Sequence, residues 1–201
     1  MAGTNSSEIR IAGVGRLYVA KADTDIPTTF GPDTATDWAQ WTDLGFTSGD
    51  GVTFSKKDKL EPVDVWQAVS PVHFVYSDRD LTLKFSLMQF NKDTLPFFMG
   101  GGSAEALTTP TGVYKYDIAD RPYADARALG LEFTDRTADG ADVTYRFGIK
   151  RGQVTAADDI KLARKAAAQL GVTFTAMANA DGSALASFVM KDAAYAGSAA
   201  S

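Results

Sequence analysis

Residues 81–94 read LTLKFSLMQFNKDT and decide the fold class. Apolar residues at positions 81, 83, 85 and 87 alternate with polar residues at 82, 84 and 86, a period of two that predicts a half-buried β-strand. Upstream, residues 41–54 read WTDLGFTSGDGVTF and end in a second alternating run, in which Val52 and Phe54 are apolar. Two predicted strands therefore flank residues 56–77, which show no clear strand period and which we interpret as an irregular segment.

Residues 56–77 read KKDKLEPVDVWQAVSPVHFVYS and mix apolar, aromatic and charged residues. One interpretation is an extended hairpin folded back on its own sheet. The other is a long inter-subunit loop, because ordering each residue costs about 1–2 kcal/mol and long loops inside compact domains are uncommon unless functional. An exposed apolar loop without a partner is also an aggregation hazard. We expect docking on a neighbouring subunit, with Trp66 as the main anchor, through Lys57, Leu60, Val63, Val65, Trp66, Val69, Val72, Phe74 and Tyr76.

A short helix is predicted after the strand at 81–87. Asn91 can serve as its N-cap, and Phe90 with Leu95 fits a hydrophobic staple. Pro96 is tolerated only in the first turn of a helix, so a later cap at Asp93 or Thr94 is the other option. Glycines 100–102 end the element, which would include Phe97 and Phe98.

The remaining chain is predicted to be β-rich. Further strands are expected at 15–21, 114–118, 129–133 and 143–149, with a hairpin turn at Asp139-Gly140, and residues 172–174 are expected to pair with 188–190. Residues 23–39 have the composition of a loop. Residues 156–170 fit a helix by composition or an edge strand by alternation. The sum is about eight strands and one short helix, which predicts a mainly β protein with an antiparallel β-sandwich or barrel.

We divide the 201 residues into three parts. Residues 1–13 are small and polar and are expected to be a flexible or partner-ordered arm, residues 14–193 a single domain, and residues 194–201 a flexible tail. The N-terminus lacks a basic region followed by an apolar one, so we expect no Sec export. No apolar run approaches the ~20 residues needed to span a bilayer, and no membrane partner is expected.

Composition excludes several functions. The chain has no cysteine, which removes disulfides and thiol chemistry. Its 20 basic and 25 acidic residues give a net charge of −5 without a basic stripe, so tight nucleic-acid binding is not expected. His73 is the single histidine, and no Gly-x-Ser-x-Gly motif accompanies it. Gly13-x-Gly15 lacks the third glycine of a dinucleotide site. We expect no enzyme, metal or cofactor.

The segments 41–54 and 85–94, together with Trp66, resemble the major tail tube proteins of phages with long, non-contractile tails, and the likeness is closest to phages of actinobacterial hosts. It extends from Gly15 to about Asp192. The resemblance implies a β-sandwich with a flanking helix that forms hexameric rings, stacked into a tube through which DNA passes without specific binding. It also implies that residues 56–77 contact the adjacent ring and that Asp158 to Lys165 is a strand.

The implied partners are further copies of the chain and the tail terminator, baseplate or tail-tip and tape measure proteins. The implied location is the tail of the virion, after assembly in the host cytoplasm. A lumen lined by Thr, Ser, Asp and Glu would suit DNA passage, because it would not hold phosphate. The alternative from another class is a capsid-decorating or carbohydrate-binding β-domain that uses Trp38, Trp41 and Trp66 as stacking platforms.

Overall fold

The computed structural model describes residues 8–31, 34–137, 140–179, 181–192 and 195. Within these residues the chain forms ten strands and two short helices. The elements are β1 (Val14–Lys21), α1 (Thr34–Asp37), β2 (Thr42–Asp43), β3 (Thr47–Val63), β4 (His73–Leu87), α2 (Thr94–Phe98), β5 (Glu105–Ala106), β6 (Tyr114–Lys115), β7 (Arg127–Arg136), β8 (Asp142–Ala157), β9 (Leu170–Ala176) and β10 (Ala186–Lys191).

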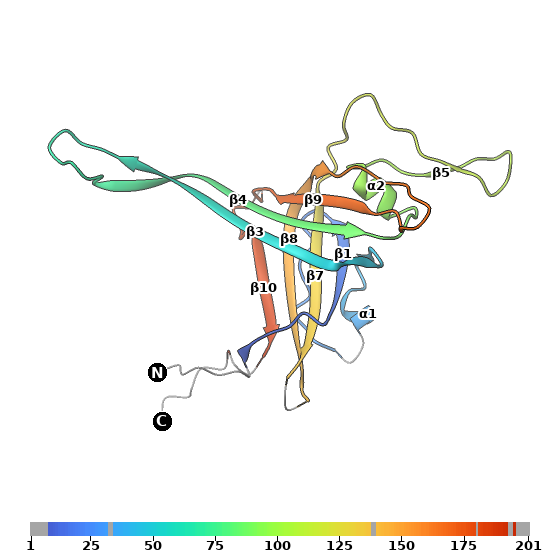
Figure 1. The fold of residues 1–201 in the computed structure, drawn as a ribbon, viewed down its shortest axis with the longest axis horizontal. Helices are drawn as coiled ribbons and strands as arrows, with labels where there is room; N and C mark the ends of the chain where they lie inside the picture. The colour runs from blue at the N-terminus through green and yellow to red at the C-terminus, as the bar shows by residue number, and fades with distance from the viewer. Residues whose placement is uncertain (1–7, 32–33, 138–139, 180, 193–194, 196–201) are drawn as a thin grey trace.

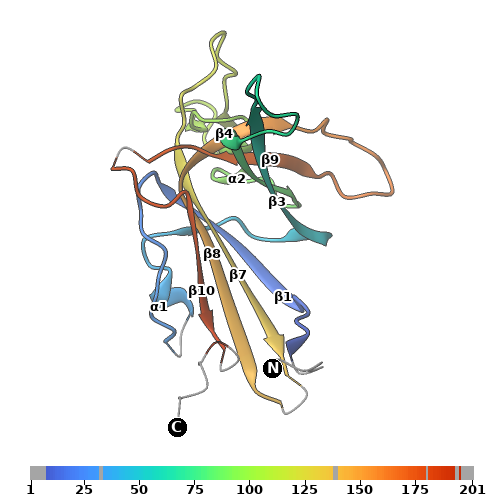
Figure 2. The ribbon, with the colours of Figure 1, turned by 90° about the vertical axis from the view of Figure 1, so that its left-hand side faces the viewer.

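Strand β8 joins two layers of one antiparallel sheet. The strand order is β2-β1-β7-β8-β9-β4-β3, and β10 also pairs with β8. The first half of β8 pairs with β10 and the second half with β9, while β7 runs along its other edge. In Figure 1 the group β7, β8 and β10 stands upright and β3, β4 and β9 cross it, and Figure 2 gives the same arrangement from the side. The prediction of a mainly β, antiparallel sandwich is confirmed.

The core lies between these two layers. The apolar side of β4, from Leu81 to Leu87, is buried as its alternation predicts. It packs with Leu17, Leu129, Phe147, Ile149, Leu170, Val172 and Phe174 from the other strands. Gly152 permits the close approach where β8 passes from one layer to the other, because a Cβ there would lie 2.5 Å from the Phe174 ring.

Helix α2 follows β4 and begins at the later of the two predicted caps. Asp93 is its N-cap residue, and Pro96 lies in the first turn, where a missing N–H is tolerated. Asn91 contributes one turn earlier: its Oδ1 accepts hydrogen bonds from the backbone N–H groups of Asp93 and Thr94, both at 2.9 Å. Gly100, with φ of +78°, follows the helix as predicted.

Two predictions about irregular or ambiguous segments are wrong. Residues 56–77 are mostly regular, because β3 and β4 stay paired from Lys56 opposite Leu81 out to Val63 opposite His73. Residues 158–165 form neither a strand nor a helix: β8 ends at Ala157, and the only pairing recorded in this part of the described chain is an isolated bridge between Ala163 and Ala166. Ile160 packs partly against the core, whereas Leu162 is exposed.

Two strand predictions also need correction. Strands β9 and β10 do not pair with each other; β9 lies between β8 and β4, whereas Phe188 of β10 pairs with Phe147 of β8. Both strands alternate correctly, but alternation does not specify the partner. The strand expected at 114–118 shortens to β6, which pairs only with β5, and Ile118 is exposed.

The described residues include part of each predicted terminal segment. Arg10 lies against the body, where its Nη2 is 2.6 Å from the Asp192 carboxylate. Residues 1–7 lie outside the described residues, as does the predicted tail except Tyr195. The domain boundaries at residues 13 and 193 remain predictions. No helix within the described residues is long and apolar enough to cross a membrane.

Candidate functional site

The outer halves of β3 and β4 form a two-stranded ribbon that projects far from the body (Figure 1). We call residues 56–77 the arm. Its strands are aligned by backbone pairing, with one register shift between Lys59 and Leu60. The turn is closed by backbone bonds from the N–H of Val72 to the carbonyl of Val63 at 3.0 Å and from Ala68 to Val65 at 3.2 Å. The arm is therefore a preformed projection from the sheet rather than an unstructured loop.

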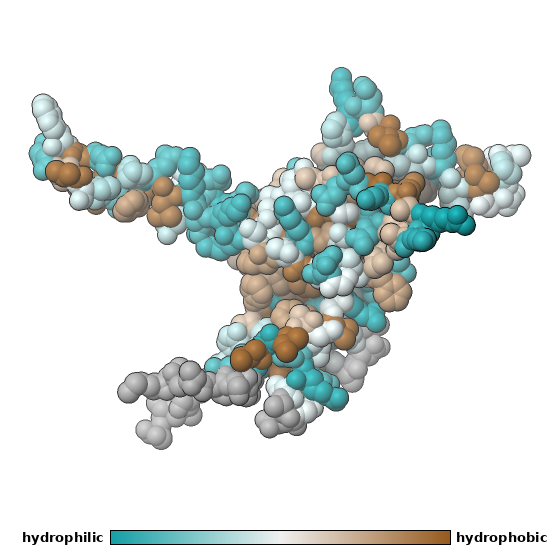
Figure 3. All heavy atoms as spheres, in the orientation of Figure 1, coloured by the Kyte–Doolittle hydropathy of each residue, from teal (hydrophilic) through white to brown (hydrophobic). Residues whose placement is uncertain are grey.

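All nine residues predicted for the inter-subunit contact are exposed on the arm. Trp66 and Val69 at the tip are completely exposed, at 100% and 107% of their reference areas. Figure 3 shows apolar and polar residues interspersed along the visible side of the arm, with no other part of the chain over that side. Exposed apolar surface of this kind marks an interaction site in a soluble protein.

The charges of the arm are paired largely among themselves. Asp58 accepts hydrogen bonds from the Lys56 ammonium and from Nε of Arg79, the latter at 2.7 Å. These two contacts, the one with Lys56 first, lower the pKa of the Asp58 carboxyl below its ordinary value. Lys59 pairs with Glu61 at 2.9 Å. Apolar side chains rather than an unbalanced charge therefore distinguish the arm.

The helix residues predicted as part of the site lie in and around the core, away from the arm. Phe97 and Phe98 are buried, and the Phe97 ring stacks on Phe85 at 6.4 Å and on Phe174 at 6.0 Å between centroids. Phe90 is exposed and Leu95 is half-buried. Together with the Asn91 cap described above, these contacts fasten the C-terminal end of β4, the end opposite to the arm.

The outer face of the β8-β9-β4-β3 layer is polar, and over its central part Lys84 is the one charged residue before Lys57 and Asp80 at the start of the arm. Register places Thr82 opposite Thr175 and Lys84 opposite Thr173, with Thr53 and Ser55 of β3 on the same face. The hydroxyls of Thr155 and Thr175 are 2.7 Å apart. We call this surface the hydroxyl face: Thr53, Ser55, Thr82, Lys84, Ser86, Gln153, Thr155, Thr173 and Thr175.

The corresponding face of β7 and β8 is covered, which the sequence did not indicate. Arg146 is buried, and it donates to Glu132 at 2.6 Å and to Asp37 at 2.8 Å. The Trp38 indole N–H donates to the same Glu132 carboxylate at 3.0 Å, and its ring stacks on Tyr18. The segment that contains α1 is thereby fixed over the sheet. Trp38 and Trp41 were the signal in the sequence that this segment covers the sheet, because large aromatic rings are usually packed against other parts of a protein.

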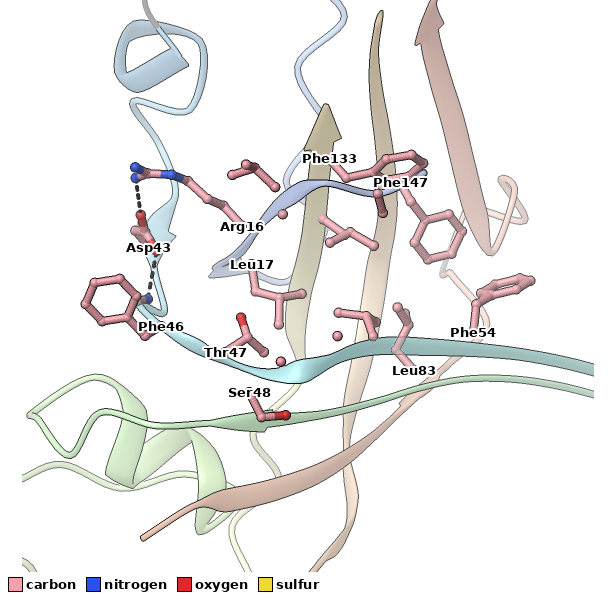
Figure 4. A pocket seen from close by; sticks show the side chains of 18 of the residues that line it. Arg16, Leu17, Asp43, Phe46, Thr47, Ser48, Phe54, Leu83, Phe133 and Phe147 are labelled. Carbon is pink, nitrogen blue, oxygen red and sulfur yellow. Dashed lines mark hydrogen bonds and ion pairs between the residues drawn. The ribbon is translucent and has the colours of Figure 1, made fainter. Parts of the chain in front are cut away.

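An apolar groove opens beside the start of β3, between that strand and β1 (Figure 4). Its volume is about 800 Å³. Phe54, Phe147 and Phe188 form an aromatic cluster at one end. The ring centroid of Phe54 lies 5.1 Å from that of Phe147 and 5.9 Å from that of Phe188. Phe46 is exposed at the other end, near the Arg16–Asp43 ion pair. Residues on β7 and β8 form the wall behind it.

The arrangement offers little for catalysis or for stacking of sugars. His73 is exposed at the outer end of β4, and no group of potential metal ligands occurs among the described residues. Trp38 is buried at 2% exposure and Trp41 packs edge-on against it, so Trp66 alone of the three predicted platforms is fully free to stack on a ligand.

Comparison with protein families gives one informative result. Residues 2–200 match the family model described as "Phage tail tube protein". No curated protein matches the chain significantly.

Proposed function

The chain belongs to the phage tail tube protein family, and from this membership we propose that it forms hexameric rings that stack into the conduit for DNA ejection. The family is structural and non-enzymatic, and it places the protein in the tail of the virion. The single observation that carries the proposal beyond the family is the arm, a preformed ribbon whose apolar side chains lack cover in the single subunit.

We propose that the arm docks on a neighbouring subunit, in the adjacent ring or the same ring. Burial of apolar surface contributes about 25 cal/mol per Å², and the nine predicted arm residues would supply it together with the ordered backbone. Trp66 is the expected anchor, because it is the most exposed aromatic residue of the arm and tryptophan is enriched among residues that dominate binding energy.

The hydroxyl face is the surface we assign to the lumen. It exposes threonine, serine and glutamine with Lys84 as its single cation among the nine residues, so it offers few groups that would hold phosphate. Sheets joined edge to edge around a ring would also satisfy the backbone groups of the terminal strand β3. A lumen dominated by lysine and arginine would contradict this assignment.

We further propose the tail terminator, baseplate or tail-tip and tape measure proteins as partners, with assembly in the host cytoplasm. Self-assembly with other tail proteins is what membership of the family implies. The long, non-contractile tail type and the actinobacterial host rest on the resemblance of residues 41–54 and 85–94 alone.

Electron microscopy of the purified protein tests the function. Negative staining of a concentration series should show rings or tubes, and class averages viewed along the axis should show sixfold symmetry. A protein that stays monomeric at every concentration and binds glycans would favour the carbohydrate-binding alternative instead.

Limited trypsin digestion tests the role of the arm. Lys56, Lys57 and Lys59 are exposed in the single subunit, so trypsin should cut there whenever the ribbon opens. Assembly should protect them, whereas Arg136, an exposed residue at the end of β7, gives a reference cleavage site on the body. Equal cleavage of the arm in monomers and tubes would contradict docking.

A further inference from the structure

We propose that the tip of the arm, residues 65–69, inserts into the groove between β1 and β3 of a second copy of the chain. This inference rests on the proposed self-association and names the acceptor site for it. It comes from two features of the same molecule: the exposed apolar tip of the arm and the apolar groove between β1 and β3.

The groove of the same chain is out of reach of its own arm. Phe54 lies in the groove and also on β3, the strand that continues into the arm. From Phe54 to Val63 an extended strand covers about 30 Å, and pairing with β4 keeps this ribbon from folding back. Because the arm leads away from the groove that it borders (Figure 1), the tip can fill only the groove of another molecule.

The two surfaces are complementary in chemistry. The groove contains five phenylalanines, and Phe46, Phe54 and Phe188 each expose 43% or more of their surface in the single chain. Its volume of about 800 Å³ lies in the range of sites that enclose a whole small molecule, which is ample for an indole ring and neighbouring valines. Trp66 and Val69 are the side chains that such a cavity would take up.

The tip supplies part of the area of a stable contact. An aromatic side chain buries about 150–250 Å², and Trp66 and Val69 are completely exposed, so the tip offers roughly 300 Å² of apolar surface. A standard protein–protein interface uses about 800 Å² per partner. The paired strands behind the tip, which are also exposed, would supply the remainder against the same neighbour.

The geometry of donor and acceptor sets the type of assembly. The tip and the groove are different surfaces, so their contact is heterologous: each subunit offers its arm to one neighbour and its groove to another. Contacts of this type close into a ring or continue as a filament. Both outcomes are compatible with a tube.

Cysteine pairing tests the contact directly, because the chain contains no cysteine of its own. Val69→Cys at the tip and Phe46→Cys at the rim of the groove are made as separate variants and co-assembled. Mild oxidation with dissolved oxygen should give a disulfide-linked dimer only from the mixture of the two. The control pairs Val69→Cys with Ile118→Cys, an exposed position on another projecting loop, and should give at most a tenth of that yield.

The double variant V69C/F46C sharpens the result. It should form a ladder of linked subunits, which stops at the ring size if the contact lies within a ring and continues further if it lies between rings. Both ladders support the inference. A monomer whose two cysteines join within one chain would overturn it.

Failure of this inference is distinguishable from failure of the proposed function. Tubes that form normally but show no more V69C–F46C product than the control would overturn the groove contact and leave the tube function intact. The same result, with assembly lost after deletion of residues 1–7, would assign the groove to the N-terminal segment. A wild-type protein that never assembles would overturn both.

Discussion

The inner and outer halves of the β3–β4 hairpin use the same two strands in opposite ways. Inside the body, β4 buries every second residue from Leu81 to Leu87. Beyond Leu81 the backbone pairing continues outward, yet each residue from His73 to Asp80 is exposed. Backbone pairing thus persists where core packing has ended. The difference shows that the body buries its apolar residues within the single chain, whereas the apolar residues of the arm stay exposed there.

The largest expected effect is on the free energy of unfolding, when the arginine of the buried ion cluster in the body is removed and the result is compared with the exposed ion pairs of the arm. Arg146→Ala should lower the free energy of unfolding by about 3–5 kcal/mol, because it leaves Glu132 and Asp37 buried without their partner. Arg79→Ala, which removes an ion pair with Asp58 of the arm, should leave that free energy unchanged within error, since Arg79 is exposed. Urea denaturation of the monomer measures both. Equal losses would mean that the arm is part of the stability core.

Truncation of leucine on either half is the next test. Leu83→Ala should destabilise the monomer by about 2–5 kcal/mol, because the side chain is completely buried and leaves a cavity. Leu60→Ala, on an exposed position of β3, should change stability by about 0.5 kcal/mol or less. Thermal unfolding followed by circular dichroism provides the comparison. A large loss at Leu60 would show that the arm folds back onto the body in solution.

For assembly, in contrast to monomer stability, substitutions on the arm should have the larger effect. Trp66→Ala should weaken association by about 2 kcal/mol, the threshold for a dominant interface residue, and so raise the protein concentration needed for tube formation by more than tenfold. Its monomer should unfold like the wild type, because Trp66 is fully exposed. Light scattering over a dilution series measures the shift. Tyr114→Ala on β6 is the matched control, an exposed aromatic residue outside the arm.

The smallest effect concerns the pH response of the arm. The lowered pKa of Asp58 means that its ion pairs with Lys56 and Arg79 stabilise the arm above the unfolded carboxyl pKa of 3.8, and that this contribution is lost as pH falls through the lower folded value. Lys56→Met should raise the Asp58 pKa. The pKa of Asp37, which the hydrogen bond with Arg146 lowers in the body, should not move. Carbon-13 NMR of the carboxyl groups measures the pKa of both residues. A change in both pKa values would show that the two ion clusters are coupled.

The sequence predicted those features that depend on neighbouring residues. Alternation from Leu81 to Leu87 identified the buried strand, and the Asn91 and Pro96 positions limited where α2 begins. The exposed apolar residues of the arm were also identified. Their regular pairing was not, because the register shift between Lys59 and Leu60 interrupts the period of two that a strand would show.

Features that depend on distant partners escaped prediction. Arg146 and Glu132 occupy the polar positions of their strands and so look solvent-exposed, but Asp37 and Trp38 approach from a segment about a hundred residues earlier. The expected pairing of β9 with β10 was wrong for the same reason. Each of these strands pairs instead with a different part of β8, which is long enough for both. The composition of residues 158–165 favoured a helix or a strand. Whether such an element finds a surface to pack on depends on distant parts of the chain, which the local sequence does not specify.

The continuity of β3 and β4 from the core to the tip has a mechanical consequence. A pull at the tip acts on β3 and β4 in the same direction, so it passes along both backbones into the body rather than separating the two strands. There the hydrogen bonds between β4 and β9, which are perpendicular to the strands, resist it together in shear. The end of β4 is itself clamped between β3 and β9 and anchored by α2. Force applied at Trp66 is therefore transmitted into the centre of the subunit without a flexible joint.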